Sequence, residues 1–351
     1  MIHVFATGIT GYVGGDAIFA IVTAHPEYTV SCLIRDKERE AAVSKKHPNI
    51  KLVYGDLDDA ELLEAEASKA DIVCHFADAT HEPSVKALIR GLARRDASQS
   101  SYFIHTTISG ILLYHDVVNG KYGESSDNVY DDLDGLSEVI DLPDFSGARR
   151  AEIATRNAGV EHGTHIKTAI VCLSTVYGIG RGVRSYRSVS IHELARSTLV
   201  KGHGIQVNNG KAAWGHIYIR DLSNIYLKLV ENAANSSKES ATETQVGPAV
   251  WGVDGFYFGE NGEHVWGEAA QWIATEAMAQ GFLQSDVVKS VSPTEAGELT
   301  PRAQFLWGCN SRPRAKRARQ LLNWQPEGPP LRQEISGIVT AEAVKLGLTK
   351  P

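Results

Sequence analysis

The stretch Thr7-Gly8-Ile9-Thr10-Gly11-Tyr12-Val13-Gly14-Gly15 follows the apolar run Ile2–Ala6 and opens a helical pattern. A glycine at a strand end permits a tight turn, a second lets backbone N–H groups approach a pyrophosphate, and a third allows close packing of helix against sheet. Gly8, Gly11 and Gly14 stand at these positions. Because glycines also serve ordinary turns, the strand and helix on either side specify the motif, which predicts a dinucleotide-binding turn.

Further apolar runs of strand length alternate with helix-like segments through the first half of the chain. The expected strands are Ile2–Ala6, Val30–Ile34, Lys51–Tyr54, Ile72–Phe76, Tyr102–Thr106 and Ile166–Cys172. The expected helices are Tyr12–Ala24, Lys37–Lys46, Ala60–Lys69, Pro83–Arg94 and Ala148–Ala158. Continuous apolar runs are typical of strands buried on both faces. Their alternation with helices predicts an α/β fold with a Rossmann-type doubly wound parallel sheet.

The second half shows this alternation less clearly. Helices are expected there around Ile191–Leu199 and Leu222–Ala233, and the polar segment Asn235–Gln245 is expected to form an exposed loop. We therefore divide the chain into a dinucleotide-binding Rossmann domain, residues 1–177, and a smaller mixed C-terminal region, residues 178–351. We expect this second region to bind the substrate and to be partly interleaved with the Rossmann core.

Composition excludes several classes of protein. The 351 residues include 43% hydrophobic and 22% charged residues, which is typical of a globular protein. The 35 Lys and Arg against 42 Asp and Glu give a net charge of -7, the wrong sign for a protein that binds a nucleic-acid backbone with its whole surface. The longest strongly apolar stretch, Ala17–Ala24, is far shorter than the ~20 residues of a membrane helix.

Cysteine and histidine usage points to a cytoplasmic protein. The four cysteines are far apart and the first three lie in expected strands, so they are interpreted as reduced core residues. The 13 histidines show no metal-ligand spacing, and no targeting signal is evident. We expect a monomer or homodimer with a small-molecule substrate and with no metal, nucleic-acid or membrane partner.

The end of the second strand decides which adenosine ribose is accepted. An acid there bonds a free 2′-hydroxyl, whereas a cation neutralises a 2′-phosphate. The position is Arg35, with Lys37 and Arg39 close behind. Because a guanidinium can stack on adenine and bind phosphate through two hydrogen bonds, the sequence favours NADP over NAD. Asp36 and Glu38 weaken this preference, and a solvated charged helix start is the alternative interpretation.

Four motifs together resemble an extended short-chain dehydrogenase/reductase. They are Thr7–Gly14, Gly55-Asp56-Leu57-Asp58 after the third strand, Thr175-Val176-Tyr177-Gly178 after the sixth, and Ser311-Arg312-Pro313-Arg314 leading to Leu322-Asn323-Trp324-Gln325-Pro326. The resemblance covers nearly the whole chain. It is greatest with an atypical fungal branch that is described as epimerase- or dehydratase-like.

The resemblance implies which residues surround the cofactor. In the turn they are Thr7, Gly8, Thr10, Gly11, Tyr12, Val13 and Gly14. Asp56 and Leu57 would flank the adenine, and Ala77 would border the cofactor after the fourth strand. Thr106 and Val176, after the fifth and sixth strands, complete the set with Arg35.

The family's catalytic signature is only partly present. In the family a tyrosine supplies a proton, a lysine four residues later lowers the pKa of that tyrosine and holds the nicotinamide ribose, and a serine or threonine orients the carbonyl. Thr106, Thr107 and Ser109 stand where the hydroxyl is expected, and Thr107 and Ser109 are the candidates that polarise the substrate oxygen. Phe145 and Arg149 occupy the tyrosine and lysine positions and cannot carry the usual proton relay. Arg149 is retained as a candidate that binds cofactor ribose or phosphate.

Other polar groups have alternative interpretations. A displaced proton donor would come from Tyr114, Tyr122, Tyr130 or Tyr177, although a single tyrosine is more often a packing residue. His105 and His75, inside expected strands, are expected to bond a neighbour rather than act in catalysis. The basic run Arg312–Arg319 is expected to be helical and to lie near the substrate or on a solvated surface.

These patterns predict an NADP-dependent oxidoreductase that transfers hydride between the nicotinamide and a small carbonyl or alcohol substrate. The missing tyrosine and lysine leave two alternatives open. One is an isomerase, epimerase or cyclase that uses bound cofactor. The other is a non-catalytic NmrA-like dinucleotide sensor, since the fold by itself does not specify the chemistry.

Overall fold

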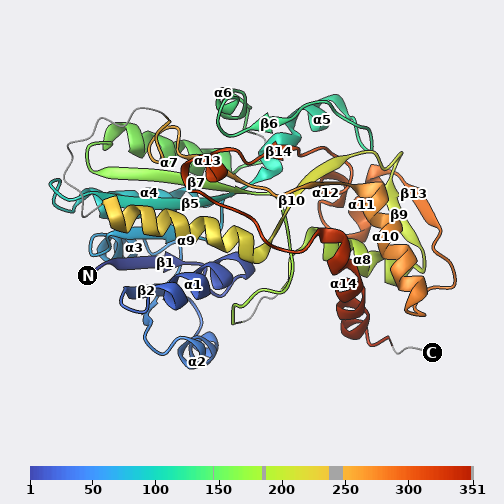
Figure 1. Cartoon of the computed structure of the whole chain (residues 1–351), viewed down its shortest axis with the longest axis horizontal. Coiled ribbons are helices and arrows are strands. Elements are labelled where there is room, and N and C mark those ends of the chain that lie inside the picture. Colours follow the sequence, from blue (N-terminus) through green and yellow to red (C-terminus); the bar gives the residue numbers. More distant parts are fainter. Residues whose placement is uncertain (145, 184–186, 237–247, 349–351) are drawn as a thin grey trace.

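The computed structural model describes residues 1–144, 146–183, 187–236 and 248–348 (Figure 1). Its strands are β1 His3–Thr7, β2 Thr29–Ile34, β3 Lys51–Tyr54, β4 Ile72–His75, β5 Ser101–Ile108, β6 Tyr130–Asp131, β7 Ile166–Leu173, β8 Thr175–Tyr177, β9 Gly204–Val207, β10 Ala213–Tyr218, β11 Phe256–Gly259, β12 Glu263–Val265, β13 Val288–Val291 and β14 Pro313–Arg314. Its helices are α1 Tyr12–Ala24, α2 Lys37–Lys46, α3 Ala60–Ala67, α4 Glu82–Ala93, the 3₁₀ helix η1 Ser109–Leu113, α5 Tyr114–Asn119, α6 Leu136–Ile140, α7 Arg149–Glu161, α8 Ser190–Lys201, α9 Ile219–Ser236, α10 Trp266–Ala279, α11 Pro293–Leu299, α12 Ala303–Leu306, α13 Arg317–Leu321 and α14 Leu331–Lys345.

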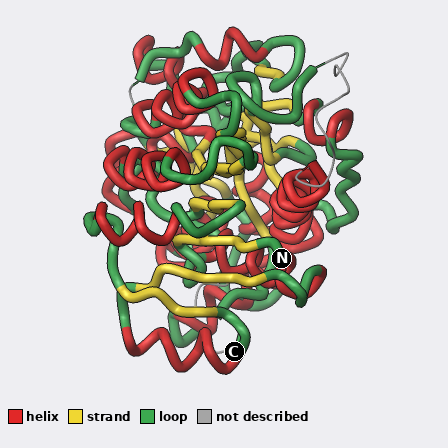
Figure 2. The backbone as a smooth tube through the Cα atoms, turned by 90° about the vertical axis from the view of Figure 1, so that its left-hand side faces the viewer, coloured by secondary structure: helices red, strands yellow, loops and turns green. Residues whose placement is uncertain are grey.

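The central feature is a seven-stranded sheet in the order β11-β7-β5-β4-β1-β2-β3, with every neighbouring pair parallel. Strand β1 shows how its two faces are covered. Val4 and Ala6 join the core under α1 and α9, whereas Phe5 joins the core under α3, α4 and α7. Figure 2 shows the strands enclosed between helices. The predicted doubly wound parallel sheet is therefore confirmed.

Some predicted elements have the observed bounds, and most of the others differ from them by one to three residues at an end. Helices α1 and α2 match their predicted ranges. The helix predicted at Leu222–Ala233 is part of α9, which packs against α1 on the Rossmann sheet although it lies beyond residue 177. The cause is its stripe of buried residues at helical spacing, which suits a sheet-covering helix. Residues Asn235 and Ser236 end α9 instead of beginning a loop, and 237–247 lie outside the described residues.

A second region is attached at the carboxyl edge of this sheet. Strand β8 follows β7 after a single residue and joins a three-stranded sheet in the order β12-β10-β8. Helices α8, α10 and α14 pack on one another around a core that contains Trp266 and Trp307. Because α9 and β11 return to the Rossmann sheet, the chain after residue 177 is shared between both parts. The substrate-binding role of the second region stays a prediction.

The cysteines behave as the sequence predicts. Cys32, Cys74 and Cys172 are buried in β2, β4 and β7, and Cys309 is buried in the second region. Burial raises the pKa of the Cys74 thiol to about 12, which keeps it a protonated core residue. Across the described parts of the chain, no helix is long and apolar enough to cross a lipid bilayer. In the same parts, no group of three or more His, Cys, Asp or Glu side chains is placed to hold a metal ion.

Candidate cofactor and active site

The glycine turn joins β1 to α1 at the centre of the sheet. Gly8 has φ of +78°, and a Cβ built there would lie 2.7 Å from the backbone nitrogen of Ala77. The Gly11 N–H donates to the carbonyl of Gly8 at 3.0 Å, and Gly11 is the N-cap of α1. A Cβ at Gly14 would lie 2.5 Å from the Gly8 carbonyl oxygen and 2.8 Å from Phe76 Cβ. Gly8 and Gly14 are thus required by the close approach of helix, turn and strand β4.

A cavity of about 730 Å³ opens beside this turn, at the carboxyl ends of β1 to β4. Seven of the residues that the sequence assigns to the cofactor line it: Gly8, Thr10, Gly11, Arg35, Asp56, Leu57 and Ala77. The remaining lining residues are Leu33, Ile34, Arg39, Asp58, Phe76, Asp78 and His81. Segments after four different strands therefore meet at one place, as expected at the switch point of a doubly wound sheet.

Two arginines lie on one side of the cavity. Arg35 is exposed and has no ion pair among the described residues, whereas Arg39 donates from Nη1 to Thr10 Oγ1 at 3.2 Å. The carboxylate of Asp36 accepts the Glu38 N–H at 2.8 Å as the N-cap of α2, and it lies 3.5 Å from Arg39 Nε. Asp36 therefore caps its own helix and pairs with Arg39, which leaves Arg35 as the unpaired cation at the rim.

The lining of the cavity also includes an acid and a histidine that sequence reasoning missed. His81 Nε2 lies 3.1 Å from Asp58 Oδ1, and its Nδ1 accepts the Ser84 N–H at 3.2 Å as the N-cap of α4. The pair joins the loop after β3 to the start of α4. Only the position of His81 directly before Glu82 and Pro83, at the start of a helical pattern, signals this cap in the sequence.

Other predicted cofactor residues do not line the cavity, and two of them form hydrogen bonds beside the glycine turn. Thr7 Oγ1 bonds His75 Nδ1 at 2.7 Å, and the Tyr12 hydroxyl donates to the Gly178 carbonyl at 2.6 Å. Val13 is half-buried on α1, and Val176 is buried in β8. His75 bonds a neighbour as predicted, and burial lowers its pKa to about 4.

The hydroxyl residues at the end of β5 fall into two groups. Thr106 Oγ1 lies 2.8 Å from the hydroxyl of Tyr226, and Thr107 Oγ1 donates to Glu152 Oε1 at 2.6 Å. Both threonines are buried, so their hydroxyls are already engaged inside the protein. Ser109 is 1% exposed, and its Oγ has no hydrogen-bond partner among the described residues. Of these three hydroxyls, that of Ser109 is therefore the one that no described residue engages.

Arg149 is a buried structural residue in this fold. Its Nη1 donates to Glu152 Oε2 at 2.8 Å, and its Nε donates to the Leu142 carbonyl at 3.1 Å. Its Nη2 donates to the carbonyls of Val139, Ile140 and Leu142. Nε and Nη2 thus hold the segment before α7 and Nη1 holds Glu152 within α7, so the geometry does not favour the predicted contact with cofactor. Phe145, the other residue in the relay frame, lies outside the described residues.

The histidine of β5 differs from its prediction. His105 is fully buried, and neither ring nitrogen has a hydrogen-bond partner among the described residues, so the expected bond to a neighbour is wrong. Its ring instead stacks on His75 at 5.5 Å and on Phe103 at 6.3 Å. Burial lowers the pKa of His105 well below its usual range, because no partner stabilises the charged ring.

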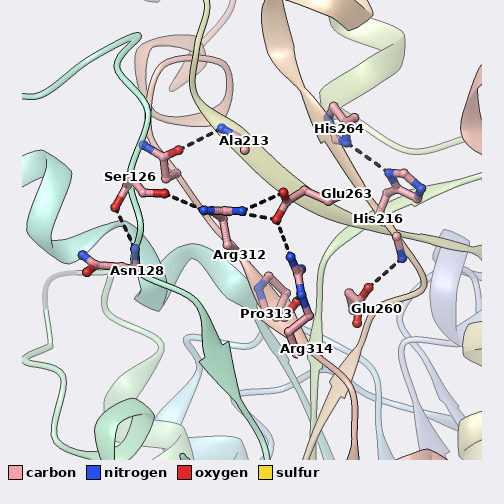
Figure 3. A network of polar contacts seen from close by, with 12 residues as sticks. Ser126, Asn128, Ala213, His216, Glu260, Glu263, His264, Arg312, Pro313 and Arg314 are labelled. Carbon is pink, nitrogen blue, oxygen red and sulfur yellow. Dashed lines mark hydrogen bonds and ion pairs between the residues drawn. The ribbon is translucent and has the colours of Figure 1, made fainter.

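The basic run is not one helix, contrary to its prediction. Arg312 precedes β14 and Arg314 lies in it, and both guanidinium groups converge on the carboxylate of Glu263 at 2.9 to 3.0 Å (Figure 3). Lys316 pairs with Asp131 and, at 3.0 Å, with Asp134. The run fails to form a continuous helix because these charges tie it to other strands and loops. Arg312, Arg314 and Lys316 therefore form ion pairs within the chain.

Tyr177, one of the alternative proton donors, is also engaged. Its hydroxyl donates to the Pro329 carbonyl at 2.6 Å, and its ring lies 5.5 Å from that of His216. Figure 3 shows His216 beside His264, with a distance of 3.2 Å between their Nδ1 atoms. Burial lowers the pKa of His216 to about 4, so this pair is a neutral one.

Known proteins are similar to this chain in sequence. The model of the NmrA-like family matches residues 2–97. The oxidase ucsJ of Acremonium sp. is 50% identical over 347 residues, which is 99% of this chain and 99% of the oxidase. The dTDP-glucose 4,6-dehydratase of Mycobacterium tuberculosis strain H37Rv is 27% identical over 139 residues, which is 38% of each chain.

Solved structures share the fold at low sequence identity. The dTDP-glucose 4,6-dehydratase of Bacillus anthracis, in complex with NAD, has a TM-score of 0.64 at 12% identity, over 97% of this chain and 96% of that one. The UDP-glucose 4-epimerase of Thermotoga maritima has a TM-score of 0.63 at 14% identity, over 98% and 100%. Together with the full-length relative, these similarities show that the chain belongs to the extended short-chain dehydrogenase/reductase family, whose oxidoreductases bind NAD(P).

Proposed function

We propose that this protein is an NADP-dependent oxidoreductase that transfers hydride between the nicotinamide and a carbonyl or alcohol group of a small substrate. The observation that carries the proposal is the cavity that brings the glycine turn together with Arg35 and Arg39. Its residues come from the ends of four strands, where this fold binds dinucleotides.

The turn suits the pyrophosphate of such a cofactor. A Cβ at Gly11 would meet only the Gly8 carbonyl oxygen, at 3.1 Å, so the outer side of Gly11 faces the cavity and not the core. The first N–H groups of a helix have no partner within that helix and attract an anion. Gly11 and the start of α1 would hold the pyrophosphate, and Asp56 and Leu57 would flank the adenine.

The charges at the rim support NADP over NAD. An enzyme that selects NAD places an acid where Arg35 stands, to bond the ribose 2′-hydroxyl. Here Asp36 is used as a helix cap and Arg35 has no acidic partner among the described residues. Arg35, with Arg39 beside it, would bind a 2′-phosphate through charge-assisted hydrogen bonds.

At the catalytic end, Ser109 is the residue that we propose to polarise the substrate oxygen. When bound, the nicotinamide supplies the hydride, and the protein supplies orientation and hydrogen-bond donors. The hydroxyl of Ser109 is the one in the Thr106 to Ser109 cluster that no described residue engages. Thr107 supports the site indirectly by holding Glu152, which in turn holds Arg149.

Calorimetry with NADPH and NADH tests the cofactor choice. The wild type should bind NADPH several-fold more tightly, and Arg35→Asp should reverse the order by removing a charge-assisted contact of about 1.5–3 kcal/mol. Arg196→Asp is the matched control, because Arg196 is an exposed arginine on α8 outside the cavity. Equal affinity of the wild type for the two cofactors would contradict the proposal.

A dinucleotide sensor is the second candidate function. The observation that favours it is the engagement of Arg149 by Glu152 and backbone carbonyls, which leaves the relay position without a free cation. A sensor would bind NADPH and oxidise none of it when a panel of aldehydes and ketones is added. Carbonyl-dependent loss of absorbance at the NADPH band would exclude it.

A further inference from the structure

We propose that Ser174 and Ser109 form a pair of hydroxyl donors that binds the oxygen of the substrate at the carboxyl edge of the Rossmann sheet. The inference rests on the proposed function, because it needs a substrate carbonyl or alcohol beside the nicotinamide. It adds Ser174 as a residue that contacts substrate, and it assigns the two serines a shared task.

The sheet register places the two serines side by side. Strands β5 and β7 are parallel neighbours, and Ile108 of β5 is paired with Leu173 of β7. Ser109 directly follows the end of β5 and begins η1, and Ser174 directly follows the end of β7. The last paired residues of the two strands are neighbours about 4.8 Å apart, so the two serines leave the sheet from adjacent points. In a doubly wound sheet, ligands bind outside these carboxyl ends. Two hydroxyl residues therefore meet at the edge where the reaction takes place.

Both side chains are buried without a partner. Ser109 is 1% and Ser174 7% exposed, and the Oγ of each has no hydrogen-bond partner among the described residues. Thr175, the next residue along, is 2% exposed and has an equally unpartnered Oγ1. Buried hydroxyls are normally hydrogen-bonded, and the unpartnered ones of Ser109 and Ser174 directly follow the ends of two neighbouring strands, so we infer a ligand that completes them.

Burial without a partner is not sufficient by itself. Ser101 is 0% exposed and its Oγ is also unpartnered, but Ser101 lies at the amino end of β5, the edge away from the site. What distinguishes Ser109 and Ser174 is the combination of an unpartnered hydroxyl with the carboxyl edge and with each other. Ser101 is therefore the matched control for both.

The backbone of each serine is fixed. The Ser109 carbonyl accepts from Ser311 Oγ at 3.1 Å, and Ser109 begins the η1 helix. The Ser174 N–H donates to the Gly259 carbonyl at 3.3 Å. Donors that are held in place before the reaction stabilise charge that develops on an oxygen without a cost of reorganisation. Two such hydroxyls suit a carbonyl oxygen, which accepts two hydrogen bonds.

Isobutyramide is a suitable probe, because its amide oxygen imitates a carbonyl and is not reduced. The experiment measures its dissociation constant from the NADPH complex of the whole protein, through the fluorescence of bound NADPH, and also measures the NADPH dissociation constant. Four proteins are compared: the wild type, Ser109→Ala, Ser174→Ala and the control Ser101→Ala. We expect each of the first two variants to bind the amide about 3- to 10-fold more weakly, as for loss of one hydrogen bond, with NADPH affinity and the control unchanged.

Each other outcome has a distinct meaning. Amide binding that is unchanged in Ser174→Ala, or absent in a wild type that binds NADPH, overturns the serine pair and leaves the cofactor assignment standing. If Ser174→Ala weakens the binding of NADPH as much as the binding of the amide, the Ser174 hydroxyl contacts the cofactor. That result also overturns the pair. A wild type that binds no NADPH refutes the proposed function and, with it, the inference.

Discussion

The proposed adenosine end, around Arg35, and the proposed catalytic end, around Ser109, use arginine in opposite ways. Arg35, at the adenosine end, is exposed beside a cavity and has no ion pair among the described residues. Arg149, near the catalytic end, is buried and bonded through all three guanidinium nitrogens. A charged residue is available to a ligand only when the fold has not already satisfied it. The polar partners of a residue therefore decide its role more than its type does.

The largest expected effect tests this contrast at Arg149. Arg149→Ala removes the cation beside the buried Glu152 and the guanidinium donors to the carbonyls of Val139 and Leu142. We expect the free energy of unfolding, measured in urea, to fall by about 3–5 kcal/mol, as for breaking a buried ion pair. Arg150→Ala is the control, because the side chain of Arg150 is 74% exposed and lies 3.9 Å from Asp144.

The double change Phe145→Tyr with Arg149→Lys restores the residue types of the family's relay. We expect it to be neutral or harmful to activity, because a lysine ammonium cannot replace bonds that leave from three nitrogens. Two results together would contradict this expectation: faster carbonyl reduction by the double variant, and an Arg149→Ala protein that is as stable as the wild type. They would show that position 149 acts in catalysis and not in stability, and the contrast between the two ends would no longer hold.

The glycine turn offers the second test, at the adenosine end. Gly11→Val places a side chain where Gly11 faces the cavity, with one close neighbour, the Gly8 carbonyl oxygen. Loss of two or more phosphate contacts should weaken NADP⁺ binding at least about 100-fold, or about 2.7 kcal/mol, by calorimetry. The thermal midpoint should fall less than for Gly14→Ala, because the Cβ at Gly11 has one tight neighbour at 3.1 Å whereas that at Gly14 has contacts of 2.5 and 2.8 Å.

Two other glycines show whether the effect belongs to the cavity. Gly14→Ala should destabilise the fold, since its Cβ would lie 2.5 Å from the Gly8 carbonyl oxygen. Gly337→Val, in α14, meets nothing within 4 Å and should leave NADP⁺ binding unchanged. Normal binding by Gly11→Val would place the cofactor away from this turn.

Local sequence was sufficient to predict the glycine turn and to place Arg35 at the end of β2, beside the cavity. The turn and the position of Arg35 are recognised from residues that are close together in the chain. The end of a strand, the spacing of the glycines and the start of a helix are all local patterns. Bounds of α1 and α2 follow from the same local patterns. The pairing of Asp58 with His81 was missed because it joins residues 23 positions apart across the cavity.

The catalytic end was predicted less well because its bonds join distant segments. Thr107 meets Glu152 across 45 positions, and Ser109 meets Ser311 across 202. No spacing rule tells which of several neighbouring hydroxyls a distant carboxylate will engage. Sequence reasoning found the hydroxyl cluster and the departure from the tyrosine and lysine pattern, but only the packing of α7 on β5 shows which groups remain unpartnered.

The smallest expected effect concerns His105, beneath the catalytic end. Its two ring nitrogens are buried without a partner, and its ring stacks on Phe103 and His75, so a phenylalanine fits the same surroundings. We expect His105→Phe to raise the free energy of unfolding by about 1 kcal/mol at pH 7.5, because it removes unpaired polar atoms. Burial also holds the pKa of His105 well below its usual range, so the native ring stays neutral while the unfolded chain takes up a proton below about pH 6.5.

Wild-type stability therefore falls as the pH decreases below about 6.5, since the unfolded state binds more protons than the native state. The variant lacks this contribution, and its advantage should grow by up to about 1.4 kcal/mol for each pH unit between 6.5 and 5. Urea unfolding of both proteins at pH 7.5, 6 and 5 measures this difference, with the exposed His115→Gln as the control. A constant difference across this range, or a less stable variant, would mean that His105 has a polar partner that stabilises its ring. The catalytic end would then contain one more engaged group, and the contrast with the adenosine end would be sharper still.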